Sequence, residues 1–280
     1  MNILITNDDG YSAKGIHVLA EIMCQFGKVT VIAPKKHQSG MSMAVSLGLK
    51  QIAYKDLPEE KPGTWAYLDA TPASCVKYGL NVPFLEKFPD VVVSGINHGS
   101  NAASAACYSG TLGAAEEAAL NGIPAIGVSL DTINPEADFS AVRKFFPDIF
   151  RKLMENMTSD PGIFYNVNFP NIPAEQIKGI RVGHQGMGRW IREFREWDPS
   201  IYKKYGITPE DLGQSSSPKH ESGEKLYMMV GDFLDDDRND SRADHWIMND
   251  GYISIVPDNL DSTDYEEVER LGKTGFDIDF

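Results

Sequence analysis

Residues 2–10 read Asn-Ile-Leu-Ile-Thr-Asn-Asp-Asp-Gly, a short apolar run that ends in two adjacent carboxylates. The run has the length and composition of a buried strand. Asp8 and Asp9 follow it directly, so we expect them at the carboxyl edge of a sheet, where open parallel sheets bind ligands. Two neighbouring carboxylates repel each other, and both stay ionised at low cost only beside water or a cation. The opening stretch therefore predicts the first strand of an α/β sheet with a candidate cation site at its end.

The residues that follow predict a β-α-β unit. Apolar residues recur at helical spacing over 15–26, and Gly27 fits a helix stop. Residues 28–33 are rich in β-branched side chains and predict a second strand, which Pro34 ends. Such a unit implies parallel strands and a right-handed crossover.

The remaining chain changes character near residue 160. Before that point, we predict strands at 45–54, 64–68, 90–94 and 124–129, with helices at 71–80, 111–120 and 135–157. After it, we predict shorter strands at 164–169, 179–184, 225–231 and 252–256, a helix at 262–271 and a short apolar tail at 275–280. The prediction is an α/β fold: a Rossmann-like, mainly parallel sheet flanked by helices, with a smaller β-rich C-terminal part. We place the boundary between residues 1–160 and 161–280, within one integrated domain.

Composition narrows the classes of function. The 280 residues are 42% hydrophobic, enough for a substantial core, and the formal net charge is −14. An acidic chain lacks the basic surface that binds a nucleic-acid polymer, although a bound cation can reverse the sign locally for a small anion. We predict no membrane span and no signal peptide. The three cysteines have no Cys-x-x-Cys spacing, which favours reduced structural thiols over a zinc site.

Polar groups follow several of the predicted strands. Asp8 and Asp9 follow the first strand, Ser39 follows the second, and Asn97 follows the strand at 90–94. Because parallel strand ends share one edge, these four residues can converge. Oxygen ligands without histidine or cysteine suit Mg²⁺, Mn²⁺ or Ca²⁺.

A second group of residues suits an anion. Tyr108-Ser109-Gly110-Thr111 opens the predicted alanine-rich helix, whose free N–H groups and dipole favour a negative charge. A phosphate beside a divalent cation satisfies both groups, which indicates phosphoryl transfer with water as the simplest acceptor.

Each of these residues also has a simpler explanation. Asp-Asp-Gly is often a turn with solvated carboxylates, and Asn97 can stabilise a loop. Ser109 and Thr111 can be helix caps. By the same reasoning we expect solvation for the loop histidines His37 and His98, for a helix face with Arg189, Arg192 and Arg195, and for the acidic run 235–237. The coincidence of four oxygen ligands and an anion site at one sheet edge favours the functional interpretation.

At these motifs the chain resembles the SurE family, the stationary-phase survival proteins, which are metal-dependent 5′-nucleotidases. The resemblance rests on 5–10, Ser39-Gly40, 93–101 and 108–111, and on shorter matches at 71–75, 166–170, 178–182 and 251–255. It runs collinearly along nearly the whole chain.

The resemblance implies a function and a set of roles. The family hydrolyses nucleoside 5′- and 3′-monophosphates, in some members also short polyphosphate, and is usually cytoplasmic. It implies a homodimer or homotetramer built with C-terminal arms, and one divalent cation per subunit, with Mg²⁺ or Mn²⁺ expected. It assigns Asp8, Asp9, Ser39 and Asn97 to the metal, and Asn101, Ser109, Gly110 and Thr111 to the phosphate. Our hypothesis for catalysis is that Asp8 or Asp9 also helps to align or deprotonate the attacking water.

This chain departs from the family pattern at a few positions. Ala70 and Ser74 replace a common glycine and aspartate, and Val256-Pro257-Asp258 replaces a common Thr-Pro-Leu. The segment 189–245 is long and charged. The metal motif is intact, so these departures bear on base preference and assembly.

Several alternatives stay open. A receiver-type signalling module also has an acidic pair after its first strand, but it needs a later phosphoacceptor aspartate and a lysine. A sugar-nucleotide transferase needs Asp-x-Asp, which adjacent acids fit poorly. A nucleotide-binding protein without hydrolysis is also compatible with the sequence. The sequence also leaves open the natural substrate, the metal, attack by water or by a carboxylate, the oligomeric state and the role of 185–245.

Overall fold

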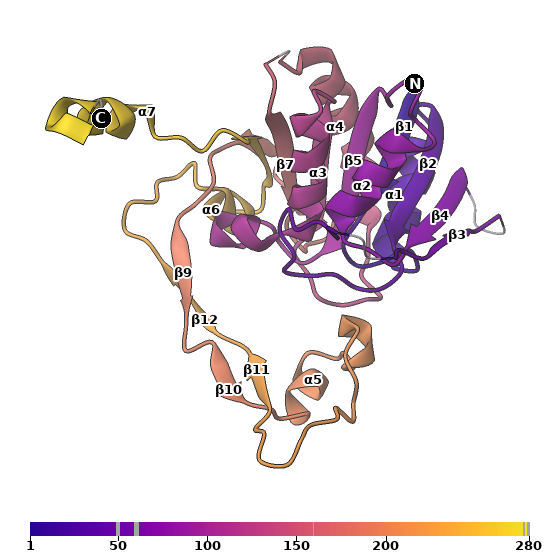
Figure 1. The fold of residues 1–280 in the computed structure, drawn as a ribbon, viewed down its shortest axis with the longest axis vertical. Helices are drawn as coiled ribbons and strands as arrows, with labels where there is room; N and C mark the ends of the chain where they lie inside the picture. Colours follow the sequence, from indigo (N-terminus) through magenta and orange to yellow (C-terminus); the bar gives the residue numbers. More distant parts are fainter. Residues whose placement is uncertain (49–50, 59–61, 159, 277, 279–280) are drawn as a thin grey trace.

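A computed structural model of the chain describes residues 1–48, 51–58, 62–158, 160–276 and 278. In this part of the chain, nine strands form one sheet in the order β3-β4-β2-β1-β5-β6-β7-β13-β8 (Figure 1). Their bounds are β1 Asn2–Thr6, β2 Lys28–Pro34, β3 Tyr54–Asp56, β4 Thr64–Leu68, β5 Val91–His98, β6 Ala125–Leu130, β7 Ile163–Phe169, β8 Ile180–Val182 and β13 Ile253–Asn259.

The centre of the sheet is parallel, as predicted. β4, β2, β1, β5, β6 and β7 pair in parallel, while β3 and β13 join the two sides in antiparallel orientation. From β1 the chain moves outward to β2 and β4 and then returns to β5 on the other side of β1. The order therefore reverses between β1 and β5. Ligands bind at such a switch point, outside the carboxyl ends of the strands.

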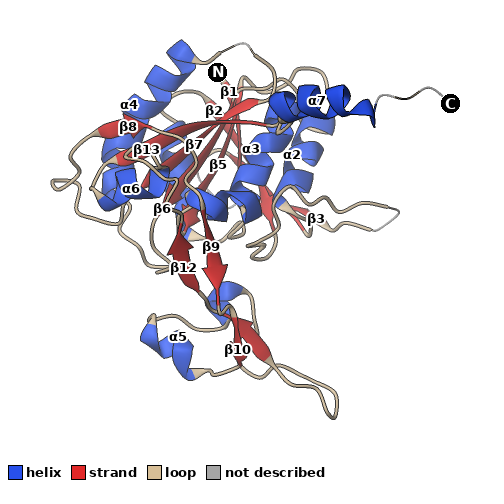
Figure 2. Ribbon diagram, turned by 90° about the vertical axis from the view of Figure 1, so that its left-hand side faces the viewer, coloured by secondary structure: helices blue, strands red, loops and turns tan. Residues whose placement is uncertain are grey.

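Helices cover both faces of the sheet (Figure 2). One face packs its buried aliphatic residues under α1 and α4, and the other packs under α2 and α3. Alternation along β1 shows this division, because Ile3 and Ile5 belong to the first core and Leu4 to the second. In the described ranges, no helix is long and apolar enough to cross a membrane. The bounds are α1 Lys14–Met23, α2 Pro72–Asn81, η1 Ala103–Tyr108, α3 Gly110–Leu120 and α4 Ser140–Asn156.

Small residues let α3 lie close to the sheet. Ala114, Ala115, Ala118 and Ala119 are at most 2% exposed, and the helix contacts β5, β6 and β7. An alanine face permits close approach of the helix backbone to the strands beneath it. As a result the N-terminus of α3 reaches the carboxyl edge of the sheet, beside the end of β1.

A long hairpin, which we call the arm (residues 185–235), leaves the body and extends away from it (Figure 1). Its two strand pairs are β9 with β12 and β10 with β11, both antiparallel. Between β10 and β11 the chain makes a compact excursion, which we call the arm lobe (198–225). The bounds are β9 Gly188–Ile191, β10 Phe194–Glu196, α5 Ser200–Lys204, η2 Glu210–Leu212, β11 Tyr227–Met229 and β12 Asp232–Asp235.

Three shorter elements complete the chain. α6 Asp244–Asn249 precedes β13, and α7 Tyr265–Leu271 continues into η3 Gly272–Phe276, a π-helical turn. Figure 1 shows α7 projecting from the body.

Two local predictions were wrong. The strand expected at 45–54 is limited to β3, because the preceding loop bonds elsewhere: the N–H of Ser46 donates to Ser74 Oγ at 2.8 Å. Residues 49–50 of that prediction, and residues 277, 279 and 280 of the predicted tail at 275–280, lie outside the described residues. Arg189, Arg192 and Arg195 lie on the arm hairpin and not on a helix face. There Arg192 and Arg195 pair with Asp232, at 2.7 and 3.9 Å.

Candidate active site

Asp8 ties the end of β1 to the N-terminus of α3. Its side chain is 3% exposed, and its Oδ1 accepts a hydrogen bond from the hydroxyl of Thr111 at 2.6 Å. The approach requires glycine at the start of the helix. A Cβ on Gly110 would lie 2.9 Å from Asp8 Cβ and 3.0 Å from Asp8 Oδ2. The predicted cation and anion groups therefore share one corner.

The environment of Asp8 disfavours an isolated negative charge. Burial, and then the charge of Asp9, raise the pKa of the Asp8 carboxyl well above its usual range. The bond from the Thr111 hydroxyl acts in the opposite direction. A cation at this corner compensates both the lost hydration and the repulsion between the carboxylates.

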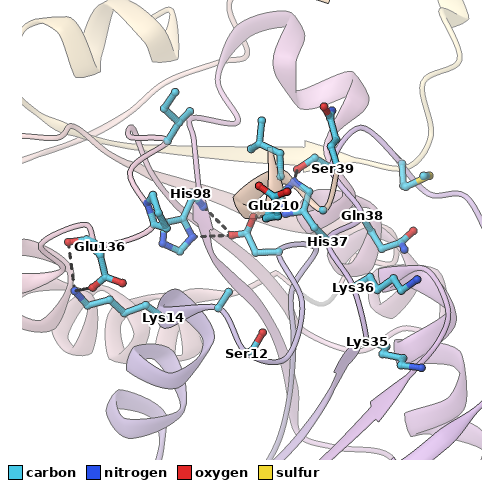
Figure 3. A pocket seen from close by; sticks show the side chains of 18 residues that line it. Ser12, Lys14, Lys35, Lys36, His37, Gln38, Ser39, His98, Glu136 and Glu210 are labelled. Atoms are coloured by element: carbon cyan, nitrogen blue, oxygen red, sulfur yellow. Dashed lines mark hydrogen bonds and ion pairs between the residues drawn. The ribbon is translucent and has the colours of Figure 1, made fainter. Parts of the chain in front are cut away.

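Asp9 is held by two histidines. Its Oδ2 accepts the backbone N–H of His98 at 3.0 Å and lies 2.8 Å from His98 Nδ1. Figure 3 draws both interactions as dashed lines ending at His98. Its Oδ1 lies 3.4 Å from His37 Nδ1. The other ring nitrogen of His37, Nε2, lies 2.7 Å from Ser39 Oγ. Asp9 thus joins the loop after β2 to the end of β5.

The remaining candidate metal ligands lie within this network. The loop with Ser39 is fixed to β1, because the N–H of Gln38 donates to the carbonyl of Asp8 at 2.7 Å. Asn97 directly precedes His98 and is 7% exposed. Its amide Nδ2 donates to the carbonyl of Gly99 at 2.7 Å, so Oδ1 is the group it can offer a cation. The structure brings the edge of β1, the loop after β2 and the edge of β5 together.

Asn101 sits further along the same edge in a buried polar network. Its N–H donates to Asn168 Oδ1, and its carbonyl accepts from Asn166 Nδ2, both at 2.8 Å. Its side-chain amide pairs with Ser129 Oγ at 2.8 Å. Asn166 and Asn168 on β7 are 0% exposed, so this part of the loop is held rigidly by fully paired groups.

Ser109 and Thr111 use their side chains differently. Ser109 caps α3, since its Oγ accepts the N–H of Leu112 at 3.0 Å, and its hydroxyl proton can still be donated. The Thr111 hydroxyl proton already goes to Asp8. An anion at this helix start would therefore meet Ser109 Oγ and main-chain N–H groups, while Thr111 serves Asp8.

A cavity of about 910 Å³ opens beside this corner. Asp9, His37, Ser39 and His98 line one part of it, and residues of the arm lobe line another. Figure 3 draws His37, Ser39 and Glu210 of the lobe as lining residues of this cavity. The space exceeds what a phosphate needs and lies within the range of small-molecule sites.

His37 and His98 were expected to be solvated loop residues, and this expectation was wrong. Their side chains are only 17% and 10% exposed, and both face Asp9. The sequence signal was present: each lies within two positions of a predicted metal ligand. Their contact with Asp9 depends on three segments meeting at the switch point, which a local pattern does not reveal.

Comparison with known proteins identifies the family. The family model described as "Survival protein SurE" matches residues 3–192. The chain belongs to the SurE family. The 5′-nucleotidase SurE of Cytophaga hutchinsonii is 38% identical over 274 residues, covering 97% of this chain and 95% of the relative. The 5′-nucleotidase SurE of Bacteroides fragilis is 34% identical over 269 residues, covering 96% and 95%.

Solved structures agree with this SurE assignment. The crystal structure of the SurE protein from Aquifex aeolicus matches with a TM-score of 0.76 and 29% identity, covering 98% of this chain and 99% of that one. The match confirms the predicted α/β fold.

The donor set of this SurE chain fits a hard divalent cation. It offers two carboxylates, a hydroxyl and an amide oxygen, the ligand types of Mg²⁺ and Mn²⁺. Among the described residues, no cluster of three or more His, Cys, Asp or Glu side chains could hold a metal ion. Besides the two carboxylates, the candidate ligands are the hydroxyl of Ser39 and the amide oxygen of Asn97.

Proposed function

We propose that this SurE-family protein is a metal-dependent phosphomonoesterase that hydrolyses nucleoside 5′-monophosphates to nucleoside and phosphate. The names of its relatives, both 5′-nucleotidases, support the reaction. We extend the proposal to 3′-monophosphates and short-chain polyphosphate as further substrates. We also propose one Mg²⁺ or Mn²⁺ per subunit, held by Asp8, Asp9, Ser39 and Asn97.

One observation supports the proposal most strongly: the hydrogen bond between Thr111 and Asp8. It puts the acidic end of β1 directly against the N-terminus of α3. A carboxylate alone at that position would repel a phosphate. With a cation between them, the same corner attracts one, and the helix N-terminus adds main-chain donors.

Each residue then has a distinct role. A divalent cation bound at this corner supplies charge neutralisation for the phosphate and lowers the pKa of a coordinated water. The Ser109 hydroxyl and the N–H of Gly110 bind phosphate oxygens. Either Asp8 or Asp9 aligns the attacking water and accepts its proton, and His98 keeps Asp9 in place. Direct attack by a carboxylate, with a phospho-aspartate, is the other route.

Asn101 is proposed as a further phosphate ligand. The hydroxyl of Ser129 can donate as well as accept. When it donates to the amide oxygen of Asn101, the NH₂ group of Asn101 is available to a phosphate oxygen. A half-turn of the Asn101 amide exchanges its oxygen and nitrogen without moving the rest of the side chain, so the hydrogen-bond network decides which of the two faces Ser129.

Hydrolysis with and without a chelator tests the proposal. We expect the protein to release phosphate from AMP and from para-nitrophenyl phosphate with Mn²⁺ or Mg²⁺, and to stop when EDTA is added. Asp8→Asn should keep the fold, as circular dichroism would show, but lose turnover. Normal AMP hydrolysis by Asp8→Asn would refute the assigned role. The stereochemical course at an isotopically chiral phosphate separates the two routes: direct water attack inverts the configuration at phosphorus, whereas the two displacements through a phospho-aspartate retain it.

We also propose the organisation of the chain and its setting. Residues 1–160 form the catalytic region, and residues 161–280 add the arm and tail within one integrated domain. A homodimer or homotetramer would bury side chains such as Phe194 and Phe276, which are 71% and 75% exposed. Light scattering of a protein that ends at Gly272 tests whether the tail takes part in this assembly. The three free cysteines support a reducing, cytoplasmic location.

A further inference from the structure

The arm lobe folds back onto the cavity of the candidate active site. Four lobe residues line that cavity together with Asp9, His37 and Ser39; they are Glu210, Leu212, Gly213 and Gln214. The approach is close. A Cβ on Gly213 would lie 3.2 Å from the Cβ of His37. The turn at 209–214 therefore lies directly against the loop that carries Ser39.

Hydrogen bonds and packing within the lobe fix the conformation of the turn at 209–214. The N–H groups of Leu212 and Gln214 both donate to the carbonyl of Pro209, at 3.0 and 2.9 Å. The side chain of Gln214 accepts the hydroxyl of Tyr202 at 2.9 Å. Tyr202 and Ile207 are 5% and 8% exposed, so the lobe has a small core of its own. These contacts hold the turn in one shape at the mouth of the cavity.

The position of the turn indicates which part of a substrate it meets. The proposed phosphate position is the corner between Asp8 and the start of α3. This corner adjoins the cavity, because a Cβ on Gly110 would lie 3.3 Å from the carbonyl oxygen of Gln38, a lining residue. The remaining lining combines charged side chains such as Lys35 and Lys36 with polar ones such as Gln38 and apolar ones such as Ile133. A mixed lining in a space of about 910 Å³ suits a ribose and a base.

We propose that the turn at 209–214 forms the nucleoside-side wall of the active site, so that the arm of this chain determines affinity for the part of the substrate beyond the phosphate. The inference rests on the proposed nucleotidase function and names the segment that would determine its substrate specificity. The wall comes from a segment more than 170 residues away from His37 in sequence.

The first test removes the wall without touching the metal corner. Trp197 donates its N–H to the carbonyl of Leu226 at 2.9 Å, just beyond the pair Glu196 and Tyr227. Residues 198–225 can therefore be replaced by Asn-Gly, which closes a two-residue hairpin. We expect kcat/KM for AMP to fall at least fivefold, through KM, while kcat/KM for para-nitrophenyl phosphate stays within twofold.

A matched pair of glycine variants provides the second test. Gly206 and Gly213 both have φ of +67°, but a Cβ at Gly206 meets nothing within 4 Å. Gly206→Val and Gly213→Val therefore carry the same backbone strain, and only the second displaces the turn from His37. We expect Gly213→Val to lower the ratio of AMP to para-nitrophenyl phosphate activity at least fivefold, and Gly206→Val to leave it unchanged.

Adenosine, which lacks the phosphate, measures the wall directly. By equilibrium dialysis of the metal-free protein, we expect its dissociation constant to rise at least fivefold in the shortened-arm protein and in Gly213→Val. An unchanged dissociation constant and an unchanged activity ratio in both would overturn the inference. If the wild-type protein hydrolyses neither phosphoester, the nucleotidase proposal fails, and the adenosine measurement still decides whether the turn is a nucleoside wall.

Discussion

Replacing Thr111 with valine should weaken metal binding without unfolding the protein. The side chain is 0% exposed, and valine has nearly the same shape, so packing is preserved. What is lost is the 2.6 Å hydrogen bond to Asp8 Oδ1. A hydrogen bond to a charged group contributes about 1.5–3 kcal/mol. Because only the ionised carboxylate binds a cation, this free energy appears in the metal affinity, as a loss of about 10- to 100-fold.

Calorimetric titration with Mn²⁺ measures this loss in the absence of any substrate. Thr111→Ser is the matched control, because it keeps the hydroxyl and removes only a methyl group. We expect its dissociation constant for Mn²⁺ to stay within about threefold of the wild-type value. The reasoning fails if Thr111→Val, with an unchanged circular dichroism spectrum, binds Mn²⁺ as tightly as the serine variant does.

Two further predictions follow from burial. Gly110→Ala should lower Mn²⁺ affinity about 5- to 100-fold. The reason is that its Cβ would lie 2.9 Å from Asp8 Cβ, and such overpacking costs about 1–3 kcal/mol. A higher melting temperature with unchanged affinity would contradict this. Asp258 has a pKa raised to about 7, first by burial and then by the charges of Asp244 and Glu116. Its folded form thus binds a proton more tightly than the unfolded chain, and its contribution to stability is lost as pH rises from about 4 to 7. Asp258→Asn should therefore be more stable than the wild type at pH 8 by about 1–2 kcal/mol, after a discount for its partial exposure, with a smaller gap at pH 4.5 in urea unfolding.

Much of the sheet could be predicted because its signals are local. The apolar run before Asp8, the β-branched residues at 28–33 and the cap at Ser109 each favour one structure within a few residues. The rule that parallel strands share a ligand-binding edge then placed Asp8, Asp9 and Asn97 together. Contacts of Asp8 with Thr111 and of Asp9 with the end of β5 agree with that placement.

Other features depend on contacts between distant segments. The segment 45–54 has the composition of a strand, but the N–H of Ser46 bonds to the side chain of Ser74 on α2. The arm strands carry charged and aromatic residues on exposed faces, so they lack the alternation that marks a half-buried strand. The contact of Gly213 with His37 exists only once the turn at 209–214 packs against the loop that carries Ser39. No local pattern contains that information.

The direction of β1 has a practical consequence. The strand begins at Asn2 and ends where Asp8 meets α3, so the first residue lies on the opposite rim of the sheet, about 15–20 Å from the cavity by strand length. In Figure 1 the chain start is at the top of the body and the arm lobe at the bottom. A bead, a dye or a purification tag attached at Met1 would thus sit on the side of the enzyme opposite the cavity and leave the cavity accessible to solvent.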